Sequence, residues 1–570
     1  MKFSKINTFL FQYKKLLFLL LLSVFIVWPL LMPGFFKVQD YLQVMRIYEM
    51  RHCIEDLQIP CRWVSDMGSG YGFPLFNYYG GFPYYFAAIF SYLLGYIGAA
   101  KLIFFLPLIL GGIFMYILVK EIFDKEVAFV AAILYLFAPY RALDVYVRGS
   151  ISEVFAMTLV PLVFYFYLKL IKSCGRINFL AATFTLAIFL LNHNLMTMLF
   201  IPVLVIWVVN WLFIQRKSGE LKKKLIAITT SFILGFMLAS FFILPAYFEQ
   251  NLIQDQNLRE SEFIPNFRAH FVTINQLFFS RFWGYGASIW GDKDEMSFQV
   301  GWPHWQLVLI MSCFMLFHII QGRSLGKSKN YLLYFIFLVI SLASLIMTHN
   351  KSAFLWELFN KLQFVQFPWR FLSITIFSVS FLGGMVILFF KKKYRIFIIL
   401  IITFLTILLN YRYFQPDNFE YQLTDKDLLS GLEWEFYQQG SLTDYLPKNA
   451  QKPNKIAPKM PIIDGDAKIE NFEKSSNKFK FRAEIRDRTL IDIPIFDYPN
   501  WQVYANSLSI KHSNKGEFGT IQIELNPGYY SVNGYFENTW LRVVANSLSV
   551  TATGIMLLIL LGRKLHLPFE

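Results

Sequence analysis

The chain has 570 residues, of which 56% are hydrophobic, 19% aromatic and only 16% charged. A soluble globular chain of this length is far more polar, so the composition excludes that class and predicts a polytopic membrane protein. The formal net charge is +15. We nevertheless expect no nucleic-acid partner, because the basic residues lie in short connectors between apolar runs, as they do in membrane proteins.

Apolar runs follow one another along the chain, and most approach the roughly twenty residues with which a helix crosses hydrocarbon. Helices are the predicted spanning form, since a helix satisfies its backbone polar groups within one segment. The first run follows Lys14 and Lys15 and lacks a small-residue cleavage site, so we expect a retained helix. The runs cover residues 16–33, 82–98, 102–119, 127–140, 151–171, 178–191, 195–214, 225–248, 304–320, 330–348, 371–390, 395–411 and 546–562.

Basic residues cluster in the short connectors, where Glu220 is the only acid. Such an excess of positive charge is typical of cytoplasmic loops. From residue 169 onward two apolar runs separate each cluster from the next, so we predict that these clusters share one side of the membrane. The clusters are Lys2, Lys5, Lys14 and Lys15; Lys169, Lys172 and Arg176; Arg216, Lys217, Lys222, Lys223 and Lys224; Arg323, Lys327 and Lys329; Lys391, Lys392, Lys393 and Arg395; and Arg563 and Lys564.

Five apolar runs precede Lys169, and an odd number of crossings would put the N-terminus on the opposite side. We therefore expect one run not to cross, and the short aromatic run 82–98 is the best candidate for a re-entrant or interfacial helix. About twelve crossings remain, with the N-terminus in the cytoplasm and the protein in the cytoplasmic membrane. The predicted outward segments are 34–100, 141–150, 192–194, 249–303, 349–370 and 412–545.

The region 412–545 is the longest polar part of the chain and separates a helical module, 1–411, from a last helix and tail, 546–570. Within it, KFKFRAEI (478–485) and TIQIEL (520–525) alternate polar and apolar residues, and an NPG sequence predicts the turn that follows. We expect a small extracytoplasmic β-sandwich. The part before it, 412–465, contains several prolines, and we expect it to form a linker or an irregular layer.

Charged residues concentrate where the outward segments meet the apolar runs. Asp40 and Arg46 follow the first run, and the segment YRALDVYVRGSISEVFA (140–156) carries a second group. If this segment begins as a helix, its first three charged residues share one face and present two guanidinium groups to one anion. Mutual ion pairing is an equally good interpretation, and for Asp40 alone a solvated loop acid is the simplest one. The charged residues of the second group are Arg141, Asp144, Arg148 and Glu153.

Arg370, in QFPWRFL, stands at the outer mouth of the run 371–390. It either extends to lipid headgroups or binds a phosphate, for which a guanidinium is well suited. Cys53 and Cys61 share the first outer loop, where a disulfide and two free thiols are equally compatible with the sequence.

Metal binding has little support from the sequence. Asp292 and Asp294 in DKDE form an Asp-x-Asp pair, but a charged loop tip is the favoured interpretation. The histidines, His193 among them, are scattered and lack the paired spacing of a zinc site.

The order and placement of several motifs resemble the multi-spanning glycosyltransferases of the GT-C superfamily. More narrowly, the chain is similar to bacterial and archaeal membrane proteins described as related to 6-pyruvoyl-tetrahydropterin synthase, near the YfhO-type group, although no soluble synthase fold or histidine zinc triad is visible. The motifs are an outer loop that opens with an acid, D-x5-R, IPCRWVSDMGSGYGFPLFNYYGGFPYYF, YR-x2-D-x3-R-x4-E, a histidine after the next helix pair, RFWGYG, QFPWRFL and the C-terminal YPNWQVYAN and GTIQIELNPGYYSV.

The resemblance implies a GT-C-like fold and transfer of a sugar from a polyprenyl-phosphate donor to a glycan, lipid or protein acceptor at the outer face of the membrane. The acid early in the first outer loop would be the catalytic base, and Asp40 has the matching position. Relatives often carry a histidine a few residues later, where this chain has Gln43, Val44 and Met45. That difference leaves the second catalytic residue of the loop unassigned.

The chemistry of such a transfer suggests roles for the other candidates. A carboxylate takes the proton of the attacking hydroxyl, with inversion at the anomeric carbon, and the departing lipid phosphate needs positive charge. Arginines are the candidates for the phosphate, and two acids are candidates for support or for a divalent cation, Mg or Mn. The phosphate candidates are Arg141, Arg148 and Arg370, the supporting acids are Asp144 and Glu153, and the candidate substrate contacts are Arg46, His193, Tyr71 and Trp63.

Two other functions remain open from the sequence. A transporter or lipid flippase would need charged residues at mid-membrane, whereas the centres of these runs are almost free of them. A non-enzymatic glycan-binding or assembly protein would use the β-domain and leave Asp40 inert.

Overall fold

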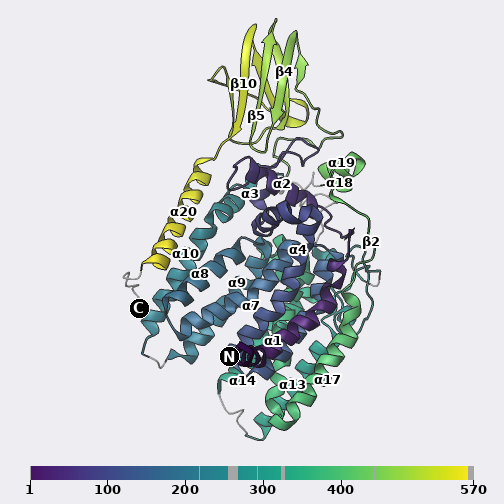
Figure 1. The fold of residues 1–570 in the computed structure, drawn as a ribbon, viewed down its shortest axis with the longest axis vertical. Coiled ribbons are helices and arrows are strands. Elements are labelled where there is room, and N and C mark those ends of the chain that lie inside the picture. The colour runs from purple at the N-terminus through teal and green to yellow at the C-terminus, as the bar shows by residue number, and fades with distance from the viewer. Residues whose placement is uncertain are drawn as a thin grey trace.

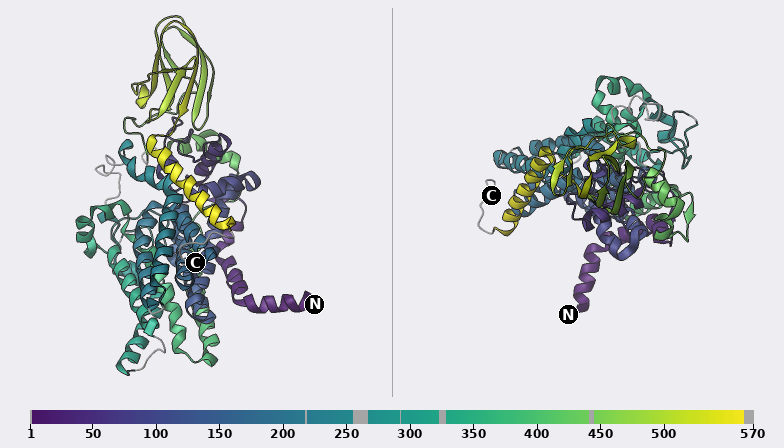
Figure 2. Two further views of the ribbon diagram at one scale, coloured as in Figure 1. Left: turned by 90° about the vertical axis from the view of Figure 1, so that its left-hand side faces the viewer. Right: turned by 90° about the horizontal axis from the view of Figure 1, so that it is seen from above.

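The computed structural model describes residues 2–216, 219–254, 267–291, 293–322, 328–440 and 445–562. It has a bundle of long helices with a β-domain standing at one end (Figures 1 and 2). Some residues singled out in the sequence lie outside the described residues. In the predicted cytoplasmic connectors they are Lys217, Arg323, Lys327, Arg563 and Lys564, and in the DKDE sequence Asp292. The side chains of Lys2, Lys5 and Lys14 also lie outside the described part of the chain.

The apolar runs of the sequence form the helices of the bundle. The first half contains α1 (Lys2–Leu31), α2 (Gln43–Glu55), α3 (Leu75–Tyr78), α4 (Phe82–Ile122), α5 (Lys125–Leu136), α6 (Pro139–Ala142), η1 (Leu143–Val147), α7 (Ile151–Lys172), α8 (Arg176–Leu190), α9 (Asn194–Ile214) and α10 (Leu221–Phe248). The second half contains α12 (Ile274–Phe278), α13 (Trp302–Ile320), α14 (Ser328–Thr348), α15 (Ala353–Leu358), η7 (Pro368–Phe371), α16 (Leu372–Met385), α17 (Lys392–Asn410), α18 (Asp425–Leu428), α19 (Gly431–Gln439) and α20 (Trp540–Leu561).

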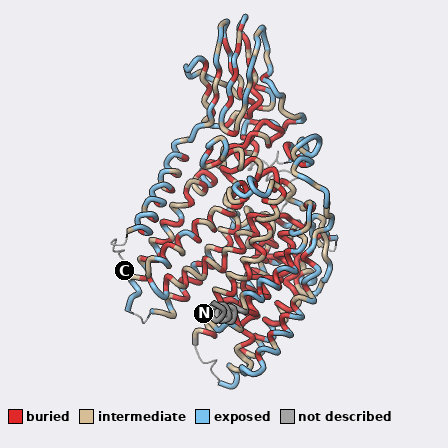
Figure 3. The backbone as a smooth tube through the Cα atoms, in the orientation of Figure 1, coloured by how far each residue is buried: buried red, intermediate tan, exposed pale blue. Residues whose placement is uncertain are grey.

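Helices suited to cross a membrane dominate the described part of the chain. Nine of them are long and apolar enough to cross a membrane. The helices Lys125–Leu136 and Pro139–Val147, which meet at a bend of 44°, make a tenth if the pair is one broken span. Lys15–Leu31 and Arg176–Leu190 are shorter apolar helices. The predicted fold class, a polytopic helical membrane protein with a β-domain before the last helix, is confirmed. Figure 3 shows that the buried residues concentrate inside the bundle and at the base of the β-domain.

One turn of the chain, residues 121–126 between α4 and α5, gathers basic residues from several predicted cytoplasmic connectors. The contacts are Lys172 Nζ to Glu121 Oε1 at 2.8 Å, Arg395 Nη1 to Asp124 Oδ2 at 2.7 Å, Lys329 Nζ to the Ile122 carbonyl at 3.3 Å and Lys15 Nζ to the Lys125 carbonyl at 3.4 Å. These connectors therefore share one end of the bundle, as the parity of the runs predicted. That this end faces the cytoplasm stays a prediction.

The runs 82–98 and 102–119 belong to one element, α4, which is interrupted at Gly95 with φ 71° and ψ 178°. The Asp425 carboxylate at the start of α18 caps the second half of α4, accepting from the backbone N–H of Tyr96 at 2.7 Å and of Ile97 at 2.8 Å. A Cβ atom on Gly95 would lie 2.5 Å from Asp425 Oδ2. The break therefore needs glycine for its positive φ and for the space that the capping carboxylate occupies.

Replacing Asp425 by Ala leaves the N–H groups of Tyr96 and Ile97 without this acceptor, so we expect a loss of about 1 kcal/mol in the free energy of unfolding, typical of a lost N-cap. Thermal unfolding of the protein in detergent micelles measures it. Asp417→Ala, in the same linker, is the control and should leave the midpoint unchanged. An unchanged midpoint in Asp425→Ala would show that the cap does not stabilise the break.

The segment 141–150, predicted to be an outer loop, is buried almost throughout. It follows the bend after α5 and continues as α6 and the π-helical turn η1, whose residues are all buried. The expectation of an exposed loop here was wrong, because the bent second half of this span is covered by neighbouring helices. Its charged residues consequently lie inside the protein.

The β-domain consists of two antiparallel sheets, with strand orders β4-β5-β10-β7-β8 and β3-β6-β9. The predicted strands at 478–485 and 520–525 appear with these bounds as β5 and β9, and the strand after the NPG turn is β10 (Gly528–Phe536). The predicted β-sandwich is thus confirmed. The other strands are β3 (Ile462–Asp464), β4 (Ala467–Lys474), β6 (Thr489–Phe496), β7 (Trp501–Ala505) and β8 (Leu508–Ile510), while β1 (Phe35–Phe36) pairs with β2 (Phe419–Glu420) away from the domain.

A buried carboxylate, that of Glu249 after α10, joins the first outer loop, α10 and α20 beneath the β-domain. It accepts from Asn77 Nδ2 at 2.9 Å, Thr539 Oγ1 at 2.8 Å and Arg542 Nε at 2.9 Å. The Tyr78 hydroxyl donates to the Glu249 carbonyl at 2.7 Å. α20 then runs beside α10 down the bundle (Figure 1), so the β-domain is anchored to the helices on both of its sides.

Candidate active site

Asp40 lies in an extended segment that pairs with the end of η1. The Gln39 N–H donates to the Val147 carbonyl at 2.9 Å, and the Asp40 N–H donates to the Arg148 carbonyl at 2.8 Å. The Gln39 side chain donates through Nε2 to the Gly286 carbonyl at 2.6 Å. Three segments that are distant in sequence therefore meet at Asp40.

The Asp40 carboxylate is partly exposed and has a fixed orientation. Its Oδ2 atom lies 2.7 Å from Arg46 Nη1, and 29% of the Asp40 side chain is exposed against 5% of the Arg46 side chain. The Arg46 guanidinium lies over the Tyr79 ring, 4.5 Å from its centroid. Arg46 thus holds one carboxylate oxygen and leaves the other side of Asp40 open to a ligand.

A buried network of four charged residues lies behind this segment. Arg148 Nη1 pairs with Asp144 and lies 2.8 Å from Glu153 Oε2, while Arg370 Nε lies 3.5 Å from the same Glu153 oxygen. The side chains of Asp144 and Glu153 are fully buried, and those of both arginines are at most 9% exposed. Two acids and two bases balance in charge, so mutual ion pairing, one of the two interpretations left open by the sequence, is present for Asp144, Arg148 and Glu153, and Arg370 joins them from η7.

Two aromatic residues that the sequence analysis did not single out complete this network. The Tyr140 hydroxyl donates to Glu153 Oε1 at 2.7 Å, and the Arg148 guanidinium lies over the Trp369 ring, 4.4 Å from its centroid. Their positions in YR-x2-D and QFPWRFL, next to the candidate arginines, were a usable signal. Pairing with Glu153 and Trp369 fixes the Arg148 side chain.

Arg141 does not join this network as a phosphate-binding residue would. It is fully buried, and its Nη2 atom donates to the Pro107 carbonyl at 2.6 Å while its guanidinium lies 5.0 Å from the centroid of the Tyr135 ring. A Cβ atom on Gly111 would lie 2.5 Å from Arg141 Nη2, so α4 packs directly on it. The expectation that Arg141 shares a ligand-binding face with Arg148 is therefore corrected: Arg141 joins α4 to the bend after α5.

His193 precedes α9 and lies near the network. Its Nδ1 atom accepts from the Met196 N–H at 3.3 Å, which caps the helix. Burial, and next the positive charge of Arg370, lower the pKa of His193 to about 3, so the imidazole is neutral. A neutral capping histidine has a structural role here, and the predicted substrate contact stays a prediction.

Trp63 and Tyr71, predicted as substrate contacts, belong to the hydrophobic core of the β-domain. Trp63 is 1% exposed and packs edge-on against Trp501 with ring centroids 5.6 Å apart. Tyr71 is 2% exposed and lies against Phe496 at 5.2 Å. Both expectations are corrected, because the first outer loop supplies these large rings to close the sandwich rather than to line an open site.

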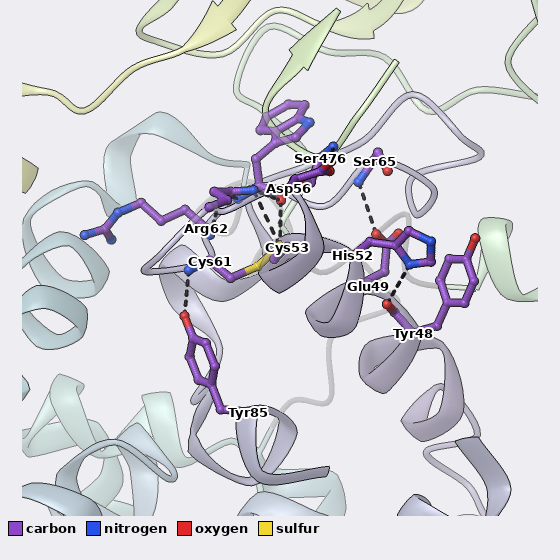
Figure 4. Close-up of a disulfide and its surroundings, with 12 residues drawn as sticks. Tyr48, Glu49, His52, Cys53, Asp56, Cys61, Arg62, Ser65, Tyr85 and Ser476 are labelled. Atoms are coloured by element: carbon purple, nitrogen blue, oxygen red, sulfur yellow. Dashed lines mark hydrogen bonds between the residues drawn. A yellow bond between two sulfur atoms is a disulfide. The ribbon is translucent and has the colours of Figure 1, made fainter. Parts of the chain in front are cut away.

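Cys53 and Cys61 form a disulfide, which decides between the two alternatives left open by the sequence. Figure 4 shows the bond at the end of α2, beside Arg62 and above Tyr85, whose hydroxyl accepts from the Cys61 N–H at 2.6 Å. In the same loop the buried Glu49 carboxylate accepts from the N–H groups of Ser65, Asp66 and Met67. The first outer loop, which carries Asp40, is thus held by a disulfide and by hydrogen bonds to a buried carboxylate.

Replacing both Cys53 and Cys61 by Ser should lower the free energy of unfolding by about 2 kcal/mol, because the unfolded chain loses the constraint of a short closed loop. Denaturant unfolding in micelles measures the change. Cys313→Ser, at an exposed free cysteine, is the matched control and should unfold like the wild type. Equal stability of all three proteins would contradict a stabilising disulfide.

The described residues contain no group of three or more His, Cys, Asp or Glu side chains that could hold a metal ion. Asp144 and Glu153 do not converge on a free site, since the Arg148 guanidinium lies between them and pairs with both. Within this part of the chain the donor set does not fit a divalent cation. A cation-assisted reaction is therefore not part of the function proposed below.

The fold and these contacts define a helical membrane protein in which a partly exposed carboxylate, that of Asp40, belongs to a segment whose backbone is hydrogen-bonded to Arg148, a member of a balanced, buried charge network. The chain belongs to the family described as "6-pyruvoyl-tetrahydropterin synthase related domain; membrane protein", whose family model matches residues 76–415. Comparison with curated proteins gives no match.

Several solved structures are similar to this chain. The oligosaccharyltransferase of Archaeoglobus fulgidus in its apo form has a TM-score of 0.44 and 12% identity over 78% of this chain and 61% of that chain. The archaeal oligosaccharyltransferase AglB from Archaeoglobus fulgidus, in complex with an inhibitory peptide and a dolichol-phosphate, has a TM-score of 0.41 and 14% identity over 78% of this chain and 61% of that chain. ArnT of Cupriavidus metallidurans bound to undecaprenyl phosphate has a TM-score of 0.36 and 11% identity over 67% and 61%. The chain therefore spans less than two thirds of the length of these structures.

Proposed function

We propose that this protein transfers a sugar from a polyprenyl-phosphate donor to an acceptor hydroxyl at the outer face of the membrane, with Asp40 as the base. The observation that carries the proposal is the position of Asp40: a partly exposed carboxylate, held by Arg46 and hydrogen-bonded through its backbone to Arg148. The family match supports a membrane protein, and the proposal of glycosyl transfer rests on the site and on the motifs of the sequence.

In the proposed reaction the acceptor oxygen attacks the anomeric carbon as the bond from that carbon to the phosphate oxygen breaks. The hydroxyl proton passes to the Asp40 carboxylate, and the electron pair of the broken bond leaves with the polyprenyl phosphate. Attack opposite the leaving group inverts the anomeric carbon. The Arg46 contact supports this role because it orients the base at one oxygen and leaves the other free.

The departing phosphate needs positive charge, and Arg148 and Arg370 are the proposed source. Each is at most 9% exposed, so its field acts in surroundings of low dielectric constant. Glu153 holds both guanidinium groups in place through its Oε2 atom. Both guanidinium groups are paired with acids in this state, so a bound phosphate would take the place of a carboxylate contact next to the segment that carries Asp40.

The direct test is to reconstitute the full chain in liposomes with radiolabelled polyprenyl-phosphate sugar and extracted envelope glycans as acceptor. Transferase activity releases polyprenyl phosphate and moves the label into the glycan fraction. A flippase would move the labelled lipid between leaflets and leave it intact, whereas a non-enzymatic assembly protein would do neither. Intact donor after prolonged incubation, with every acceptor fraction unlabelled, would refute the proposal.

A further inference from the structure

A polar pocket next to the candidate active site is not used by the reaction proposed above. It encloses about 440 Å³ between α12 and residues 293–298, a volume within the range of about 300–1,000 Å³ typical of ligand sites. Its walls include Asn275, Gln276, Phe282, Asp294, Ser297 and Phe298. Of the DKDE residues that the structure describes, Lys293 and Glu295 are exposed, as expected of a charged loop tip, whereas Asp294 is buried at the pocket.

The lining combines hydrogen-bond acceptors, donors and one aromatic face. The Asp294 side chain is 8% exposed, accepts from Gln276 Nε2 at 3.0 Å and from the Met296 N–H at 3.1 Å, and has no cationic partner among the described residues. Burial raises the pKa of Asp294 to about 6. Phe282 is 53% exposed and borders the same cavity. A pyranose, which has hydroxyls around its rim and C–H groups on its faces, matches this combination.

The pocket is connected to the candidate active site by direct contacts. Its wall residue Phe298 stacks on Trp369 with ring centroids 5.4 Å apart, and the Arg148 guanidinium lies over the same Trp369 ring. On the second side, the turn at Gly286 bonds to Gln39, the residue before Asp40, and Gly286 N–H donates to the Glu295 carbonyl at 3.2 Å. A sugar held here lies within one layer of side chains of the charge network.

We propose that this pocket is a saccharide-binding subsite that recognises one pyranose unit of a substrate through Asn275, Asp294 and the Phe282 ring. The inference rests on the proposed glycosyl transfer for its biological role, but the binding itself does not require transfer. The unit belongs either to the acceptor glycan or to the donor. In the first case the pocket lowers the KM for the glycan, and in the second case it lowers the KM for the lipid-linked sugar.

The test uses the full chain in detergent micelles with methyl β-glucopyranoside and methyl β-galactopyranoside as probes in saturation-transfer NMR. We expect at least one probe to bind to the wild type at millimolar concentration and binding to be roughly fivefold weaker in Phe282→Ala, the size typical of one lost aromatic contact. Asn275→Ala, which removes an exposed hydrogen-bonding group, should weaken binding by a similar factor. Phe279→Ala is the matched control, because Phe279 is equally exposed at 58% but does not line the pocket.

Three results distinguish this inference from the proposed function. Asp40→Asn should bind the probe like the wild type, so lost transfer with retained binding supports both proposals. Absence of probe binding to the wild type, or equal binding in Phe282→Ala and wild type, overturns the subsite even where transfer is observed. In the transfer assay, a higher KM of Phe282→Ala for the glycan assigns the subsite to the acceptor, and a higher KM for the lipid-linked sugar assigns it to the donor.

Discussion

Replacing Asp40 by Asn is expected to reduce sugar transfer by about 10²–10⁴-fold, the range associated with loss of a general base. Asn keeps the size of the side chain and its contact with Arg46 through the amide oxygen, but it cannot accept the proton of the attacking hydroxyl. The effect should therefore fall on kcat rather than on KM. Initial rates of label transfer at several donor concentrations measure both quantities.

Glu420→Gln is the control for this substitution. Glu420 is also a partly exposed carboxylate paired with a basic residue, Lys37 at 3.2 Å, and it belongs to β2, the strand that pairs with β1 before Asp40. Its neutralisation should leave the transfer rate within a factor of about two, since exposed pairs contribute little. Full activity in Asp40→Asn would mean that another group accepts the proton and that the proposed base is wrong.

Replacing Glu153 by Gln is expected to lower the free energy of unfolding by about 3–5 kcal/mol, because it leaves buried arginines with too little compensating charge. In the native protein the Glu153 carboxylate contacts Arg148 and Arg370 and accepts from the Tyr140 hydroxyl. After the substitution Asp144 is the remaining acid facing two guanidinium groups. Denaturant unfolding in micelles, followed by tryptophan fluorescence, measures the change.

Glu357→Gln provides the matched comparison, since Glu357 also pairs with an arginine, Arg268 at 2.6 Å, but both side chains are at least half exposed. Its loss should cost less than about 1 kcal/mol. The difference between the two variants isolates the contribution of burial. Equal effects would show that the buried network contributes no more than a surface ion pair.

The charge network shows which contacts can be predicted from residues that are close together in the sequence and which cannot. Asp144 and Arg148 lie four residues apart, so their pairing was predictable from helical spacing. The pairing of Arg148 with Glu153, five residues later, does not follow from that spacing, because the helical turn η1 ends before Glu153. The contribution of Arg370 was not predictable, because η7 reaches Glu153 only through the packing of distant helices. Arg141 has the spacing of a ligand residue and yet donates to α4 carbonyls, since its direction depends on where α4 lies.

In the first outer loop, too, some features could be predicted from the sequence and others could not. Its aromatic residues marked it as unusual, but exposure of Trp63 and Tyr71 to substrate was the wrong interpretation, because these rings fill the sandwich core. A large aromatic side chain in a polar segment is either exposed or buried, and only the tertiary structure decides which, and against which partner. The disulfide was equally undecided until the two cysteines were brought together.

The sequence by itself determined the membrane class, the apolar helices, the common end of several basic connectors and three strands of the β-domain, β5, β9 and β10, because each of these follows from hydrophobicity and periodicity along a continuous segment. The tertiary structure decided which charges meet, that the backbone of Asp40 bonds to Arg148, and that a polar pocket forms between α12 and residues 293–298. These features depend on contacts between segments far apart in the chain, where local pattern carries no information about direction or distance.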